Sequence, residues 1–196
     1  MPGPSQPPPP PVLTDGVVTL RCLVAADVAA VLAGEDDDQV RWLNEGHRSE
    51  PGRLAAFVEQ NAREWAGGGP RRHLGITDAA TGELAGTVEA HLALPDPPPG
   101  GVNVSYAVFP RWRGRGYAAR AVRLLLAWLS EHTDAHTVVL RIDPRNTASL
   151  RVARDLGAVP RPGGVDGLLH HHVPVPRRSP AEPRGASGVS GAGGPA

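Results

Sequence analysis

The chain has very little cysteine: Cys22 is the only one among 196 residues. A single cysteine excludes an intramolecular disulfide and fits a reducing compartment. Net charge is also absent, with 20 basic and 20 acidic residues, so no global field favours nucleic acid or an anionic membrane. No apolar run approaches the roughly 18 residues of a membrane-spanning helix, and the start lacks the basic and apolar regions of a signal peptide. We therefore expect a cytoplasmic protein without a membrane or nucleic-acid partner.

Proline and glycine are abundant, with 22 and 24 residues, and many of them lie near the two ends of the chain. Residues 1–11 are rich in proline, and residues 177–196 are rich in Pro, Gly, Ser and Ala, so neither segment has a pattern that packs into a core. The length suits one domain with tails. We predict a disordered arm over 1–11, one folded domain over 12–176 and a disordered tail over 177–196.

The most informative stretch is VSYAVFPRWRGRGYAARA, residues 104–121. The alternation of Val104, Tyr106 and Val108 with smaller or polar residues predicts a strand, which Pro110 ends because it has no amide proton. A basic loop with two glycines follows and opens an apolar helix. Glycine lets the backbone come close to a ligand, and the free amides at a helix start attract an anion. This order predicts a diphosphate cradle. Three arginines add positive charge to it: Arg111, Arg113 and Arg115.

The order R-x-x-G-x-G, after a strand and before an apolar helix, resembles the acyl-CoA-binding signature of the GNAT N-acetyltransferase superfamily. A second match follows at residues 146–158, NTASLRVARDLGA. It is similar to a segment of the branch that includes the ribosomal-protein N-terminal alanine and serine acetyltransferases, although Ala158 stands where that branch usually has an aromatic residue. The resemblance covers residues 17–175, and two motifs in the correct order are a stronger signal than one glycine pair.

Hydrophobic periodicity divides the domain into strands and helices. Strands are predicted over residues 17–23, 73–77, 84–92, 102–108, 137–142 and 168–175, and helices over residues 27–33, 50–65, 117–130 and 147–156. The resemblance implies an α/β fold with a single mixed, mostly antiparallel sheet, a parallel central pair and helices on both faces. The acidic run at residues 35–38 is interpreted as a solvated loop, with a rim that attracts a cationic substrate as the alternative.

The resemblance also implies that acetyl-CoA binds at the cradle as a cosubstrate. Backbone amides from Arg113 to Ala118 would hold its diphosphate, and backbone groups at Val108 would bond its pantetheine arm. Asn146 matches a family asparagine that contacts this arm, although its place before a helix also suits a capping role. The cofactor-binding residues implied in this way are Val108, Arg111, Arg113, Gly114, Arg115, Gly116, Tyr117, Ala118 and Asn146.

The resemblance gives fewer indications about catalysis. Ser149 matches a serine proposed as the proton donor to the departing thiolate, although a small residue in the first turn of a helix needs no function. Asn103 stands where relatives often carry a glutamate as base, and an amide cannot usefully accept a proton at neutral pH. An amine that receives an acetyl group must first lose a proton. Three choices remain for the group that removes it: Glu89, His91, or a water chain through Asn103 and Ser105. The catalytic candidates are Ser149, Asn103 and Glu89.

The implied function is acetyl transfer from acetyl-CoA to a primary amine on a protein N-terminus or a small molecule. Direct attack in a ternary complex is favoured because no activated cysteine nucleophile is apparent. Two alternatives stay open: a catalytically silent CoA-binding sensor or scaffold, favoured by Asn103, and a binder of nucleic-acid phosphates at the basic loop. We expect a monomer or a homodimer. No metal is expected, because His170, His171 and His172 would alternate between the faces of a strand.

Overall fold

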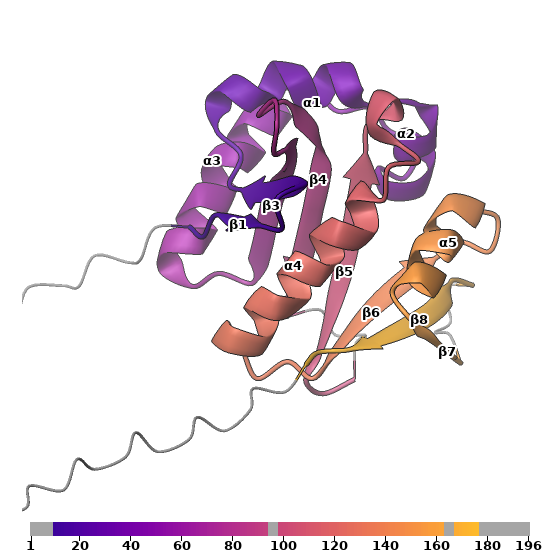
Figure 1. Cartoon of the computed structure of the whole chain (residues 1–196). Coiled ribbons are helices and arrows are strands. Elements are labelled where there is room, and N and C mark those ends of the chain that lie inside the picture. Colours follow the sequence, from indigo (N-terminus) through magenta and orange to yellow (C-terminus); the bar gives the residue numbers. More distant parts are fainter. Residues whose placement is uncertain (1–9, 94–97, 163–166, 177–196) are drawn as a thin grey trace, which may run out of the picture.

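The computed structural model describes residues 10–93, 98–162 and 167–176. One sheet contains the eight strands of this part of the chain, in the order β1-β2-β3-β4-β5-β6-β8-β7 (Figure 1). Neighbouring strands are antiparallel except for the parallel pair β5 and β6, as predicted. The predicted tail, and the predicted arm up to residue 9, lie outside the described residues. The strands are β1 (Leu13–Thr14), β2 (Val18–Arg21), β3 (Arg71–Asp78), β4 (Leu84–His91), β5 (Gly101–Val108), β6 (Thr137–Ile142), β7 (Val159–Arg161) and β8 (Leu169–Pro174).

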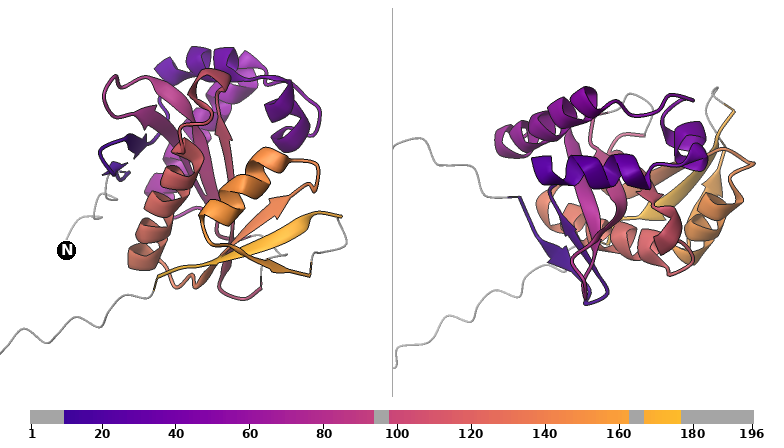
Figure 2. Two further views of the ribbon diagram at one scale, coloured as in Figure 1. Left: turned by 45° about the vertical axis from the view of Figure 1, so that its right-hand side comes forward. Right: turned by 90° about the horizontal axis from the view of Figure 1, so that it is seen from above.

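Helices cover both faces of the sheet, which confirms the predicted fold class (Figure 2). On one face lie α1 (Val28–Gly34), α2 (Asp37–Leu43) and α3 (Pro51–Gly67), and on the other lie α4 (Tyr117–His132) and α5 (Thr147–Asp155). α4 is the crossover between the parallel strands β5 and β6. Its apolar side is buried, since Ala121, Val122, Leu125 and Leu129 are all 0% exposed. In the described part of the chain, no helix is long and apolar enough to cross a membrane.

The acidic run is not a solvated loop, which corrects the interpretation made from the sequence. Asp36 caps α2 by accepting a hydrogen bond from the Gln39 amide at 3.1 Å. The Glu35 side chain is only 3% exposed. Its carboxylate accepts from the amide and the hydroxyl of Ser49, at 3.0 and 2.6 Å, and from the side chain of Asn44 at 2.8 Å. These donors replace water, so the buried carboxylate fixes the segment before α3 to the end of α1.

An ion pair between Arg21 and Asp27 connects the start of α1 to the sheet. Two nitrogens of Arg21 on β2 donate to the Asp27 carboxylate at 2.7 and 2.8 Å, and the Val24 amide donates to it at 2.8 Å. Asp27 ends the short 3₁₀ helix η1 (Ala25–Asp27) and is buried. The hydrogen bond from Arg21 outweighs the opposing effect of burial and lowers the pKa of Asp27 below its ordinary value of 3.8.

We predict that Asp27→Asn lowers the free energy of unfolding by about 1.5–3 kcal/mol, because it removes a charge-assisted hydrogen-bond pair from a buried position. Urea denaturation at pH 7 measures the loss, and Asp134→Asn at an exposed site is the control. The difference between wild type and variant should disappear as the pH falls through the lowered pKa of folded Asp27, since protonation also removes the ion pair. A difference that persists at pH values well below the lowered pKa of folded Asp27 would contradict this account.

Candidate active site

The parallel strands β5 and β6 separate partway along their length. Their register runs only from Gly101 opposite Thr137 to Asn103 opposite Val139. β5 nevertheless continues to Val108, while β6 stays paired with β8 over all six of its residues. The two strands therefore form a V-shaped opening beyond Asn103, and their divergence is visible in Figure 1.

The pairing between β4 and β5 determines which backbone groups face this opening. The Phe109 amide donates to the Ala85 carbonyl at 2.8 Å, so every second residue before Phe109 also turns its backbone groups toward β4. Tyr106 and Val108 turn theirs toward the opening. Within the described residues, the partner found for these groups is Arg113, whose Nε donates to the Val108 carbonyl at 3.0 Å. Apart from the Val108 carbonyl, the backbone groups of Tyr106 and Val108 are thus free to bond an extended ligand at the opening.

The glycine loop begins α4 directly after the end of β5 that borders the opening. Gly114 and Gly116 have φ values of 75° and 77°, in the left-handed region that favours glycine. A Cβ at either position would meet nothing within 4 Å, so the space above the loop is open. Among the described residues, none accepts a hydrogen bond from the backbone amides of residues 114–119. These amides and the positive end of the helix dipole form an anion site.

Two of the loop arginines contact Trp112. The Arg115 guanidinium lies 5.0 Å from the centroid of the ring, and Arg115 lines a hollow with Gly116. Arg111 lies at 4.9 Å from the same ring, but it is also paired with Glu83 at 2.6 Å. The side chains of Tyr117 and Ala118 are buried, so these predicted residues can contribute to the cradle through their backbone amides.

Arg113 connects the cradle to the opposite helix layer. Its two terminal nitrogens donate to the two carboxylate oxygens of Asp36 at 2.7 and 2.8 Å, and Asp38 lies at 3.4 Å. The hydrogen bond from Arg113 lowers the pKa of Asp36, against the effect of burial. Arg113 also holds the Val108 carbonyl. Its guanidinium is thus shared with α2, and of the three loop arginines only Arg115 has no acidic partner among the described residues.

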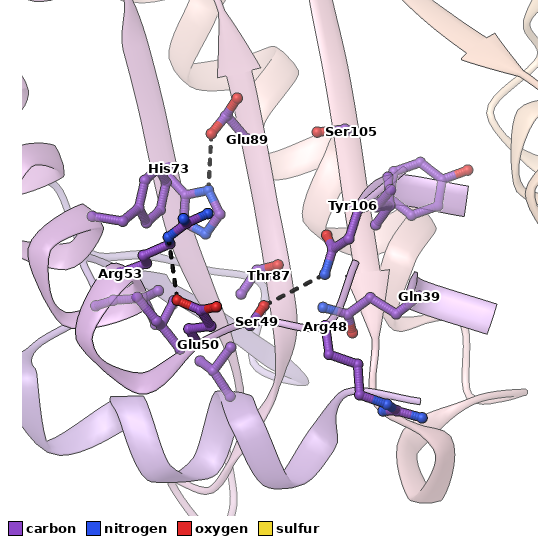
Figure 3. A pocket seen from close by; sticks show the side chains of 16 residues that line it. Gln39, Arg48, Ser49, Glu50, Arg53, His73, Thr87, Glu89, Ser105 and Tyr106 are labelled. Atoms are coloured by element: carbon purple, nitrogen blue, oxygen red, sulfur yellow. Dashed lines mark hydrogen bonds and ion pairs between the residues drawn. The ribbon is translucent and has the colours of Figure 1, made fainter. Parts of the chain in front are cut away.

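A cavity of about 360 Å³ lies on the face of the sheet that α1, α2 and α3 cover (Figure 3). Its apolar wall comes mainly from these helices, and its polar floor comes from β3, β4 and β5. Polar lining residues that matter below are Gln39, His73, Thr87, Glu89, Ser105 and Tyr106. Because β5 contributes to this floor and also borders the V-shaped opening, the cavity and the opening lie on either side of one strand.

Glu89 and His73 form a hydrogen-bonded pair on the cavity floor. The two residues are directly opposite in the register of β3 and β4, and His73 Nδ1 lies 3.0 Å from Glu89 Oε2. Burial acts to raise the pKa of Glu89, but the hydrogen bond and charge of His73 outweigh it and the pKa stays below its ordinary value. Glu89 is therefore a carboxylate at neutral pH.

The other base candidates lie on the same face. Ser105 is opposite Glu89, and Asn103 is opposite His91, in the register of β4 and β5. The structure therefore brings together Glu89, His91, Asn103 and Ser105. Asn103 and His91 do not line the cavity, and Asn103 Oδ1 and His91 Nδ1 are buried without a hydrogen-bond partner among the described residues. No group of three or more potential metal ligands occurs in the described residues.

Ser149 lies near a tyrosine that the sequence did not single out. The Tyr106 hydroxyl is buried and lacks a hydrogen bond of normal geometry among the described residues. Burial, partly offset by the nearby Ser149 hydroxyl, raises the pKa of Tyr106 to about 12. Asn146 caps α5, because its side-chain oxygen accepts from the Ser149 amide at 3.0 Å. The capping role considered for Asn146 is thus present.

A fold of this kind occurs in a known family. The sequence model of the acetyltransferase (GNAT) domain family matches residues 18–159, so the chain belongs to this family. GNAT acetyltransferases use acetyl-CoA as the acetyl donor. A comparison with curated protein sequences gave no match.

Solved structures share the fold. The ribosomal-protein-S5-alanine acetyltransferase from Vibrio fischeri has a TM-score of 0.71 at 17% identity, over 87% of this chain and 100% of its own. An acetyltransferase from Agrobacterium tumefaciens str. C58 has a TM-score of 0.67 at 24% identity, over 83% and 93%. Mycobacterium smegmatis RimJ, in complex with CoA-disulfide, has a TM-score of 0.65 at 21% identity, over 88% of each chain.

Sequence reasoning missed His73 and Tyr106. His73 lies sixteen residues before Glu89, and their contact depends on the strand register, which no local pattern reveals. The strand pattern includes Tyr106 but gives it no function. The signal that could have found it is a tyrosine among aliphatic residues just before the glycine loop.

We predict that Gly116→Asp weakens acetyl-CoA binding at least tenfold, about 1.4 kcal/mol, because it places a carboxylate where an anion site is open. Calorimetric titration with acetyl-CoA measures the change. Gly68→Asp is the matched control, since Gly68 ends α3 with φ of 73° and a Cβ there would also meet nothing within 4 Å. Equal affinity in the two folded variants would remove Gly116 from the cofactor site.

Proposed function

We propose that this protein transfers the acetyl group of acetyl-CoA to a primary amine by direct attack in a ternary complex. The observation that carries the proposal is the position of β5. On one side it borders the V-shaped opening and the glycine cradle, and on the other it contributes to a cavity with an ionised carboxylate. Donor and acceptor can therefore approach one strand from two sides, with no need for an acyl-enzyme. Cys22 does not line the cavity, and burial raises the pKa of its thiol to about 11.

The donor side fits acetyl-CoA. The free amides of residues 114–118 suit its diphosphate, with Arg115 beside them. The amides of Tyr106 and Val108 suit the amide groups of its pantetheine arm. Asn146 can contribute its side-chain nitrogen, since its oxygen is used in capping α5. Bound acetyl-CoA supplies a thioester as the activated acetyl group.

The acceptor side suits an amine. The Glu89 carboxylate on the cavity floor attracts an ammonium group, and its partly buried position strengthens this attraction. Protein N-termini are included among the candidate acceptors because the Vibrio fischeri structure is named as an alanine acetyltransferase of a ribosomal protein.

Ser149 and Tyr106 suit the thiolate that leaves. Tyr106 is on β5, which borders the opening, and the Ser149 hydroxyl is close to the Tyr106 hydroxyl. Neither group is ionised at neutral pH, since the pKa of Tyr106 is raised to about 12. Each can therefore donate a hydrogen bond to developing negative charge on sulfur. Asn103 cannot take a proton, and its buried oxygen suits ordering of a water molecule.

An assay of free thiol tests the proposal. The purified chain is mixed with acetyl-CoA and one of three amines: alaninamide, an unblocked alanine tripeptide or 1,4-diaminobutane. We expect thiol release that depends on at least one amine and yields its acetylated product by mass spectrometry. Saturable acetyl-CoA binding without amine-dependent release would instead favour the silent CoA-binding module. Absence of acetyl-CoA binding would overturn both.

We further predict that Ser149→Ala lowers kcat about 10- to 100-fold and leaves the Kd of acetyl-CoA within about twofold, because the hydroxyl acts only on the charged thiolate. Steady-state kinetics and calorimetry measure the two quantities. Thr147→Ala, at an exposed position in the same first turn, is the control. Wild-type turnover in Ser149→Ala would assign Ser149 a structural role only.

A further inference from the structure

The hydrogen-bonded pair on the cavity floor, His73 and Glu89, contains two groups that can take a proton, the imidazole and the carboxylate. The surroundings of these two groups differ. Glu89 Oε2 is bonded to His73 Nδ1, which orients the imidazole and leaves Nε2 as its second nitrogen. Nε2 has no hydrogen-bond partner among the described residues. Solvent can reach it, because it does not belong to the fully buried polar atoms that lack a partner. In Figure 3 the edge of the ring opposite Glu89 lies on the side of Arg53 and Thr87, which also line the cavity.

Side chains of α3 hold both the backbone and the ring of His73. The buried Asn61 of α3 bonds both its backbone groups, donating to the carbonyl at 3.0 Å and accepting from the amide at 3.3 Å. The Trp65 indole donates to the same carbonyl at 3.3 Å. The ring of Phe57 meets the imidazole edge-on, with centroids 4.9 Å apart. The ring therefore has a fixed position at the cavity floor before any acceptor binds.

We propose that Nε2 of His73 takes the proton from the acceptor ammonium, and that Glu89 is a positioning residue that fixes the tautomer of this imidazole. The inference rests on the proposed function and assigns its base. Glu89 as the direct base is the alternative that the test must separate.

Acid strengths favour the imidazole. An alkylammonium group loses its proton near about pH 10, an ordinary imidazole has a pKa of about 6.5 and an ordinary glutamic acid about 4.3. Proton transfer from the amine to an imidazole is thus roughly 100-fold less unfavourable than transfer to a carboxylate. The carboxylate instead stabilises the imidazolium that forms.

The other charges around His73 are largely paired among themselves. At the cavity rim Arg53 is paired with Glu50 at 3.2 Å, and Arg48 is paired with Asp37. The groups that face or flank His73 from the packed elements are Glu89 and His91 on β4, Arg71 on β3, Glu50, Arg53 and Glu64 at α3, Arg48 before α3 and Tyr106 on β5.

The proton balance is complete with these groups. Nε2 accepts one proton from the ammonium, and the freed lone pair forms the bond from nitrogen to the acetyl carbon. The carbon–sulfur bond breaks, and sulfur keeps the electron pair. After the attack, the nitrogen loses its second proton. The Ser149 and Tyr106 hydroxyls relay a proton to the sulfur, which leaves as a neutral thiol. His73 then returns its proton to water through the cavity.

The test uses His73→Asn in the full chain. The asparagine side chain keeps a donor near the position of Nδ1 for Glu89 but removes Nε2. With alaninamide as acceptor we expect kcat to fall about 100- to 10 000-fold, while the KM of acetyl-CoA is unchanged. With methoxyamine, which is uncharged at neutral pH and needs no base, the loss should be less than about tenfold. His132→Asn, outside the cavity, is the control and should match wild type.

The pH profile gives a second readout. In wild type the rate with alaninamide should fall as the pH decreases, because a protonated base cannot accept the proton of the ammonium group. The His73→Asn profile should lack this step. Wild-type rates in His73→Asn, together with loss of activity in Glu89→Gln, would overturn the proposal and make Glu89 the base.

A measurement that does not depend on enzymatic turnover distinguishes failure of the proposed base, His73, from failure of the proposed acetyl-transfer function. Nitrogen NMR of ¹⁵N-histidine-labelled protein at neutral pH should show His73 protonated at Nδ1 and unprotonated at Nε2, and Glu89→Gln should mix the tautomers. A proton on Nε2 would overturn the assignment of the base. The expected tautomer in a chain that acetylates none of the three amines would overturn the proposed function instead.

Discussion

The separation of β5 from β6 is the constraint on which the rest of the site depends. Three register pairs join the two strands, and beyond Asn103 each strand follows its other neighbour, β4 or β8. The sheet is thus two well-paired halves that share a short parallel seam. Because a closed seam would satisfy the backbone groups of Tyr106 and Val108, the opening is what makes them available to a ligand.

Local charge pairing explains how a chain without net charge contains strongly polar surfaces. The carboxylate of Glu35 is surrounded by donors, Asp36 is held by Arg113, and Glu89 is held by His73. Each of these acidic groups is therefore stabilised by a specific neighbour and not by solvent. The backbone amides at the start of α4 lack such a neighbour among the described residues, and this sets the cradle apart from the paired surfaces around it.

The sequence predicts those parts of the structure that depend on local pattern. The strand before Pro110, the glycine loop and the buried helix after it appear as β5, the left-handed Gly114 and Gly116, and α4. The sequence does not predict β1 and β7, because strands of two and three residues have no periodicity to detect.

Long-range contacts are harder to predict. The solvated-loop interpretation fails at Glu35 because its donor Ser49 lies fourteen residues away, and α2 escapes detection because it is a short helix next to an acidic run. The sequence identifies Glu89 as a proton carrier, but its partner His73 is known only once the register of β3 and β4 is fixed.

Arg113 links the two halves of the site through one side chain. Its guanidinium joins Asp36, at the start of the helix that borders the cavity, to the Val108 carbonyl at the V-shaped opening. A substitution that moves α2 therefore also disturbs the end of β5 beside the opening. A change at Asp36 therefore alters the surroundings of the Val108 carbonyl through Arg113, although the two positions belong to opposite layers of the fold.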